Sequence, residues 1–162
     1  MKKKRRTSAG SETAWPLFER PGFLARRVHQ IHVSLFSEIC ADAGVTPVQY
    51  SLMSVLVDRN VADQTTLARI VALDRTTTTG ALKRLQARGL VQRVTSKEDR
   101  RSQACRLTPA GRALVASMEA SARRAHEATV EPLTKSEQRH LIALLKRIVA
   151  AHDERRQKPE LL

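Results

Sequence analysis

Hydrophobic residues repeat at helical spacing near both ends of the chain. In residues 23–41 they lie three or four positions apart, at Leu24, Val28, Ile31, Leu35 and Ile39. In the last long stretch they occur at Leu141, Leu144, Leu145, Ile148 and Val149. Because an α-helix has about 3.6 residues per turn, each set lies on one helix face. The pattern therefore predicts a long amphipathic helix at each end.

Capping residues mark the start of a central helix. Thr46 stands before Pro47, and Gln49 follows Thr46 by three residues, which is the pattern of a capping box. This helix is predicted to end at residues 58–60. Its apolar spacing predicts a buried face made of Val48, Leu52, Val55 and Leu56.

Two further helices follow, with only a few residues between them. Asp63 is predicted to cap the first, and Asp74 to cap a longer second one that ends at Gly89. The first helix carries the apolar residues Leu67, Ile70 and Val71. A short helix, a tight turn and a longer helix make a helix-turn-helix.

A hairpin and two more helices complete the predicted fold. Residues 90–94 and 102–107 are expected to be strands joined by the polar loop 95–101, which together form a wing. Thr108 caps a helix that ends near residue 129, and Thr134 with Glu137 forms a second capping box. The fold class is mainly α, with about six helices: a winged helix-turn-helix lobe with a two-stranded β wing, and a helical dimerisation region.

These elements divide the chain into five segments. They are a disordered basic arm (1–14), an N-terminal dimerisation helix (15–45), a winged helix-turn-helix DNA-binding lobe (46–107), C-terminal dimerisation helices (108–156) and a tail (157–162). A homodimer is expected because the apolar faces of the terminal helices are too extensive for the small lobe to cover.

The net charge of +13 favours a polyanionic partner such as nucleic acid. Residues 2–6 supply five positive charges, and +8 remains without them. No apolar segment follows this run, and no stretch is long enough to span a membrane. The two cysteines, Cys40 and Cys105, form no CxxC pattern, so a reducing cytoplasm is the expected location.

The helix that Asp74 caps has the composition of a DNA-recognition helix. Four consecutive threonines, at residues 76–79, are each worse helix formers than alanine, which indicates a functional role. Thr78 shares a face with Leu82 and Leu85, and this face is expected to point to the core. Hydroxyls and cations near the helix N-terminus suit bases and phosphates in the major groove. The DNA-binding residues predicted here are Thr65, Arg75, Thr76, Thr77, Thr79, Lys83 and Arg84.

The tip of the predicted wing is also cationic. Lys97, Arg100 and Arg101 surround Asp99. A thin hairpin with arginines can enter the minor groove, where the potential is negative. Because phosphates repel a carboxylate, Asp99 is assigned to orienting an arginine, either Arg101 or one in the recognition helix.

Taken in order, these segments resemble the MarR family of bacterial transcription regulators. The resemblance covers residues 20–150 and rests on TPVQY at 46–50, LA at 67–68, the capped recognition helix, RGLV at 88–91, DRR at 99–101 and LTPAG at 107–111. It implies a triangular homodimer, with Arg101 in the minor groove and a small ligand between dimerisation region and lobe that weakens DNA binding. Two recognition helices would read a pseudo-palindromic duplex with half-sites about 10 base pairs apart.

Polar and aromatic side chains gather at the start of the first helix. The candidate ligand-binding residues are Trp15, Arg20, His29, His32 and, further along, Tyr50. An arginine with a histidine can hold a carboxylate. Residues 20–24 and 29–32 are similar to a MarR subgroup that includes repressors of nicotinate degradation, which implies a catabolic operon and a 6-hydroxynicotinate-like effector. Alternatively, the histidines pack at the dimer interface. No metal site and no other cofactor is expected, because His29 and His32 lack a third ligand.

Other functions have less support in the sequence. MarR relatives that sense peroxide use a cysteine near the start of the first helix, whereas Cys40 lies near its end. The chain has no nucleophile elbow, phosphate-binding glycine loop or zinc motif, so no enzyme is expected. The lobe has few of the aromatic residues on which RNA bases stack. A regulator controlled by redox or another signal, or a protein that binds nucleic acid without sequence specificity, are the remaining alternatives.

Overall fold

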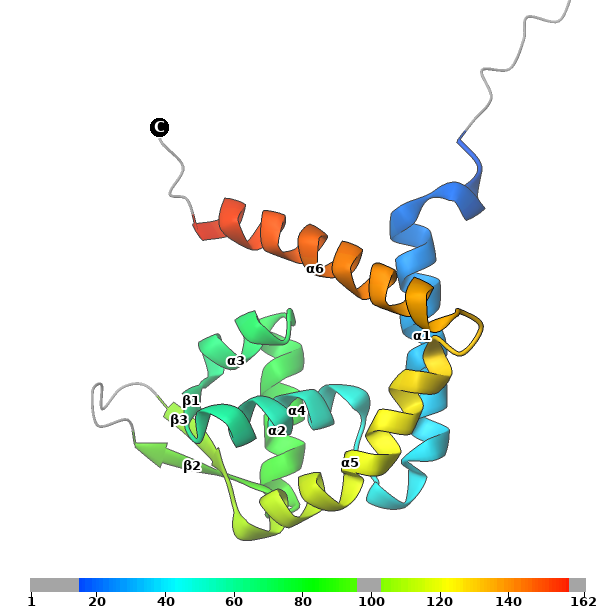
Figure 1. Cartoon of the computed structure of the whole chain (residues 1–162). Helices are drawn as coiled ribbons and strands as arrows, with labels where there is room; N and C mark the ends of the chain where they lie inside the picture. Colours follow the sequence, from blue (N-terminus) through cyan, green and yellow to red (C-terminus); the bar gives the residue numbers. More distant parts are fainter. Residues whose placement is uncertain (1–14, 96–102, 158–162) are drawn as a thin grey trace, which may run out of the picture.

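The computed structural model describes residues 15–95 and 103–157, and these form six α-helices and a small sheet (Figure 1). The helices are α1 (Pro21–Ile39), α2 (Pro47–Arg59), α3 (Gln64–Ile70), α4 (Arg75–Ala87), α5 (Pro109–Thr129) and α6 (Lys135–Gln157). Two short 3-10 helices flank α1: η1 (Leu17–Glu19) and η2 (Ala41–Ala43). The predicted mainly α fold with a β wing is confirmed. None of the helices in these ranges combines the length and hydrophobicity that a bilayer-spanning helix needs.

The sheet has three antiparallel strands, one more than the sequence predicts. They are β1 (Ala62–Asp63), β2 (Val91–Thr95) and β3 (Gln103–Leu107), in the order β1-β3-β2. Val91 pairs with Leu107, and Thr95 with Gln103, as in a hairpin. β1 spans only two residues and pairs with Ala104 and Cys105. A strand this short has no periodicity to detect, so only its pairing with β3 reveals it.

The capping residues begin the helices where the sequence predicts. Thr46 and Gln49 form both hydrogen bonds of a capping box, and the side chain of Asp63 accepts from the backbone N–H of Thr66. Asp74, Thr108 and Thr134 cap α4, α5 and α6 in the same way. Each cap satisfies a backbone donor that the helix leaves unpaired at its start.

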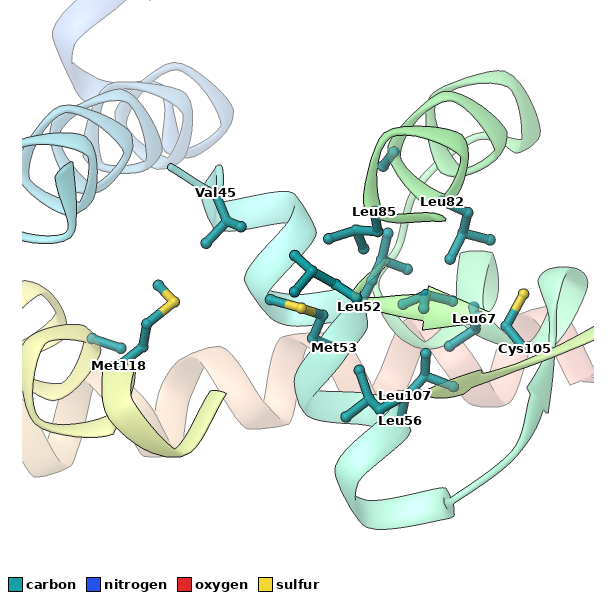
Figure 2. Close-up of a cluster of buried hydrophobic side chains, with 14 of the residues drawn as sticks. Val45, Leu52, Met53, Leu56, Leu67, Leu82, Leu85, Cys105, Leu107 and Met118 are labelled. Carbon is teal, nitrogen blue, oxygen red and sulfur yellow. The ribbon is translucent and has the colours of Figure 1, made fainter. Parts of the chain in front are cut away.

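The core surrounds α2, which meets α3, α4 and the sheet on one side and α1 and α5, with Phe36 and Met118, on the other (Figure 2). Leu52 and Leu56 are buried as predicted, but Val48 and Val55 are only partly buried at the core edge. The expected buried face of α2 was therefore partly wrong. Because α2 also contacts α1 and α5, its buried arc is rotated and takes in further residues. These are Gln49 and Met53.

Helices α1 and α5 lie side by side and antiparallel, and α6 extends away from this pair (Figure 1). The apolar face of α1 is largely uncovered: Leu24, Val28 and Ile31 are 42% to 48% exposed. On α6, Leu145 and Ile148 are 49% and 57% exposed. Leu141 and Leu144 are half-buried. The amphipathic pattern at both ends of the chain thus produces apolar surfaces that the rest of the described chain does not cover.

Candidate DNA-binding surface and effector site

The recognition helix α4 is divided into a buried face and an exposed face. Thr78, Leu82 and Leu85 are buried in the core, as predicted. The Thr78 hydroxyl donates to the Asp74 carbonyl at 2.9 Å, so its burial leaves no polar atom unpaired. The other predicted DNA-binding residues of α4 lie outside the core: Arg75, Thr76, Thr77, Lys83 and Arg84 are exposed, and Thr79 is half-buried.

The exposed cations of α4 are available to a polyanion. Among the residues that the structure describes, the ion pair found joins Glu119 and Arg123 on α5, and none involves α4. Arg75, Lys83 and Arg84 therefore face solvent without a carboxylate partner in these ranges. Cations in this state can replace the counterions of DNA phosphates. Thr65, at the start of α3, is exposed as well.

The threonine hydroxyls are less free than the sequence suggests. Thr77 donates to the carboxylate of Asp74 at 2.6 Å, and Thr79 donates to the Arg75 carbonyl at 2.7 Å. The hydrogen bonds that Asp74 accepts from Thr77 lower the pKa of its carboxyl group. Thr76 is the member of the run whose hydroxyl has no bonded partner within the described ranges.

Gln64, the first residue of α3, contacts α4 and was missed by the sequence analysis. Its amide Nε2 donates to the hydroxyl of Thr79 and lies 3.5 Å from the carbonyl of Arg75. Fifteen residues separate Gln64 from Thr79, and no local pattern links positions at that distance. The sequence did offer one signal for Gln64: it is a polar residue at the first position of the first helix of the helix-turn-helix.

The predicted wing residues Lys97, Asp99, Arg100 and Arg101 lie outside the described residues. The structure does place the two strand ends from which this segment starts and to which it returns, because Thr95 pairs with Gln103. The assignment of these four residues to DNA stays a prediction.

Trp15 and Arg20 lie together just before α1. The guanidinium of Arg20 donates to the Trp15 carbonyl through Nε at 3.1 Å and Nη2 at 2.8 Å. Both residues are exposed. Within the described ranges the remaining N–H groups of Arg20 have no hydrogen-bond partner, so they can meet an anion.

His32 lies about 18 Å further along α1, at 1.5 Å per residue, in a group of rings. It stacks on His126 of α5 with ring centroids 4.5 Å apart, and it lies 6.0 Å from Phe36. Phe36 in turn lies 5.5 Å from Tyr50. The sequence analysis missed His126, because the pairing of α1 with α5 is not a local feature. His29 is exposed.

A contact with Thr129 indicates which ring nitrogen of His32 carries the proton. Nδ1 of His32 lies 3.0 Å from the Thr129 hydroxyl, and this hydroxyl donates its one proton to the Ala125 carbonyl at 2.8 Å. With this donor direction the hydroxyl accepts from His32, which assigns the proton of the neutral ring to Nδ1. Nε2 of His32 is left as a hydrogen-bond acceptor.

Tyr50, on α2, connects this group of rings to a cavity. The cavity has a volume of about 370 Å³ and is also lined by Ser54, Arg112 and Glu119. A single chain thus brings His32 and Tyr50 near each other through Phe36, but it leaves Arg20 and Trp15 far from both. One small aromatic acid cannot contact all five predicted ligand-binding residues of one chain.

Acid is expected to destabilise the protein through His32. Burial lowers the pKa of His32 from its ordinary value of 6.5, and the charges of His126 and His29 lower it further. The unfolded chain therefore binds the proton more readily, and the stabilisation, complete above pH 6.5, is lost as the pH falls through the folded-state pKa. Between about pH 7.5 and pH 5, thermal unfolding should show a larger loss of stability in wild type than in His32→Asn. The exposed-site variant His140→Asn is the control and should lose as much stability as wild type. Equal losses of stability in wild type and His32→Asn would contradict this assignment.

Both cysteines are buried and free. Burial raises the pKa of the Cys40 and Cys105 thiols, which disfavours the thiolate that redox chemistry requires. Within the described ranges, no group of three or more His, Cys, Asp or Glu side chains is placed to hold a metal ion.

A helix-turn-helix with an exposed cationic recognition helix and an adjoining β hairpin defines a winged helix-turn-helix DNA-binding protein. The MarR family model matches residues 45–103. The transcriptional repressor NicR of Pseudomonas putida is 31% identical over 137 residues, which are 85% of this chain and 87% of NicR. The chain belongs to the MarR family, and it is a transcription regulator and not an enzyme.

Two solved structures of regulators share the fold over most of their length. One is BpsR of Bordetella bronchiseptica, whose DNA binding is regulated by 6-hydroxynicotinic acid; it is 30% identical, with a TM-score of 0.78 over 84% of this chain and 97% of BpsR. The other is PcaV of Streptomyces coelicolor in complex with its natural ligand, 31% identical, with a TM-score of 0.77 over 86% of this chain and 99% of PcaV.

Proposed function

We propose that the protein is a homodimeric, cytoplasmic repressor of a catabolic operon, and that a small aromatic carboxylate releases it from DNA. The effector class is proposed from the similarity to BpsR, whose DNA binding is regulated by 6-hydroxynicotinic acid. This similarity covers 84% of the chain. The similarity to the transcriptional repressor NicR supports the role as a repressor. 6-Hydroxynicotinate is therefore the first candidate effector.

The proposed DNA-binding surface combines α4, the start of α3 and the wing. The exposure of Arg75, Thr76 and Lys83 supports this surface, because these side chains can reach a duplex while the lobe keeps its packing. The remaining members are Thr65, Thr77, Thr79, Arg84, Lys97, Asp99, Arg100 and Arg101. Their phosphate contacts should make the affinity fall steeply with salt.

The proposed dimer forms through the uncovered apolar faces of α1 and α6. Exposed apolar patches on this scale mark interfaces, and two-fold pairing covers the same patch on both copies. Two recognition helices related in this way read a pseudo-palindromic duplex, with half-sites about 10 base pairs apart.

The proposed effector site is centred on His32. Because Nδ1 of His32 is committed to Thr129, its Nε2 accepts from a hydroxyl or N–H group, such as that of a hydroxypyridine. The carboxylate of the effector needs a cation, and Arg20 of the same chain is too far from His32 to supply it. Arg20 and Trp15 can therefore take part only in a site that a second subunit completes.

We expect 6-hydroxynicotinate to release the protein from a duplex that wild type has selected from a random library. Nicotinate, which lacks the hydroxyl donor, should act only at about fivefold higher concentration, since one hydrogen bond contributes about 1 kcal/mol. His32→Asn keeps a donor for Thr129 but removes Nε2, so it should lose this preference. Fluorescence anisotropy of the labelled duplex measures the release of wild type by each compound and the release of His32→Asn. The control variant is His140→Asn. Release by nicotinate and 6-hydroxynicotinate at the same concentration would contradict the site, and release by neither would contradict the effector class.

A further inference from the structure

Gln64 joins the two helices of the helix-turn-helix at the end where the recognition helix begins. Its Nε2 donates to the Thr79 hydroxyl and lies near the Arg75 carbonyl, and both of these acceptors belong to α4. Gln64 and Thr79 are half-buried and Arg75 is exposed, so the contact lies at the surface of the lobe. Below it, Leu67 and Leu85 already hold α3 and α4 together in the core.

The protons at this contact can be assigned one by one. Thr79 has a single hydroxyl proton and donates it to the Arg75 carbonyl at 2.7 Å. With this donor direction the group facing its oxygen is a donor, which agrees with the amide orientation of Gln64, Nε2 toward α4. The two N–H groups of Gln64 then point at Thr79 and Arg75, and the amide Oε1 is left as an acceptor.

We propose that Gln64 is a positioning residue for operator recognition, which clamps the first turn of α4 to α3 and fixes Thr79 as a hydrogen-bond acceptor. This inference rests on the proposed DNA-binding surface. The buried leucines determine that the two helices pack, whereas the Gln64 contact determines the angle and the hydroxyl orientation at the end that meets the bases. A reading surface must be held to about 0.5 Å to discriminate its target.

The proton assignment also predicts which base edges this surface reads. Thr79 and Gln64 both offer acceptors, so they suit the amino groups of cytosine and adenine in the major groove. A free glutamine would pair with adenine through its amide N–H and its carbonyl together. Gln64 cannot form that bidentate pair while both its N–H groups are engaged with α4.

The test uses the full-length protein and the duplex that wild type selects from a random library, with a scrambled duplex of the same composition. Gln64→Ala should bind the selected duplex about tenfold more weakly, because both subunits of the bound protein lose the contact, while binding to the scrambled duplex should hardly change. Gln86→Ala, at an exposed position near the other end of α4, is the matched control and should behave as wild type.

Thr79→Val removes the hydroxyl at nearly constant volume and provides an independent variant. If Gln64 acts through Thr79, the double variant Gln64→Ala/Thr79→Val should bind no more weakly than the weaker single variant. Thr79→Ser keeps the hydroxyl and should retain the coupling to Gln64. Thermal unfolding of each variant verifies that the lobe is folded.

Three outcomes would overturn the inference. They are an unchanged affinity of Gln64→Ala for the selected duplex, additive losses in the double variant, and an equal loss on selected and scrambled duplexes. If wild type selects no sequence at all, sequence-specific DNA binding itself fails, and the inference fails with it. The wild-type and variant measurements therefore separate the failure of the clamp from the failure of the proposed function.

Discussion

Replacing Leu145 of α6 with aspartate is expected to make the protein monomeric at micromolar concentration and to weaken its binding to the selected duplex by about 100-fold or more. Leu145 is 49% exposed on the apolar face that also carries Ile148 and Val149. A carboxylate there would have to be buried without a partner when two copies meet. The second recognition helix would then no longer be tethered to the first, and the gain from bivalent binding would be lost.

The control for this variant is Ala143→Asp, which places the same charge on the opposite side of the same helix. Ala143 is exposed, so we expect this variant to remain dimeric and to bind DNA with little change. Sedimentation or light scattering gives the oligomeric state, and anisotropy gives the affinity. A dimeric Leu145→Asp protein with unchanged affinity would show that α6 does not form the interface.

Replacing Gly111 with alanine is expected to lower the free energy of unfolding by about 3 kcal/mol, at the upper end of what overpacking costs. A Cβ at Gly111 would lie 2.1 Å from the carbonyl oxygen of Leu90 and 3.2 Å from Cδ2 of Leu107. The Leu90 oxygen cannot simply move away, because it accepts from the backbone N–H of Thr108 at 3.0 Å. The clash therefore separates α5 from the start of the wing.

Gly80→Ala provides the matched control, since a Cβ at Gly80 meets only the end of the Arg84 side chain at 3.6 Å. This glycine lies inside α4, where alanine is the better helix former, so the variant should gain roughly 0.5–1 kcal/mol. Urea unfolding followed by circular dichroism, at one protein concentration for all variants, measures both changes. A Gly111→Ala protein as stable as wild type would show that α5 and Leu90 are not in the close contact described.

The sequence by itself determined the helices, their order and the class of the fold. Thr46, Asp63, Asp74 and Thr108 begin helices as predicted because a cap bonds to a backbone group only a few residues away. The apolar face of α4 was also predictable, since Thr78, Leu82 and Leu85 follow the period of a single helix. Local signals of this kind need no knowledge of what packs against the element.

Only the tertiary structure decided which elements meet and therefore how the candidate sites are built. The strand β1 exists because β3 pairs with it. The contact of Gln64 with Thr79 spans 15 residues, and that of His32 with Thr129 spans 97. Side chains so far apart in the chain are brought together by the packing of whole helices, and the hydrogen bonds that fix their donor and acceptor roles form only then. Periodicity and capping are set within one or two helical turns, so they fix where each helix lies in the sequence but not which side chains it will meet.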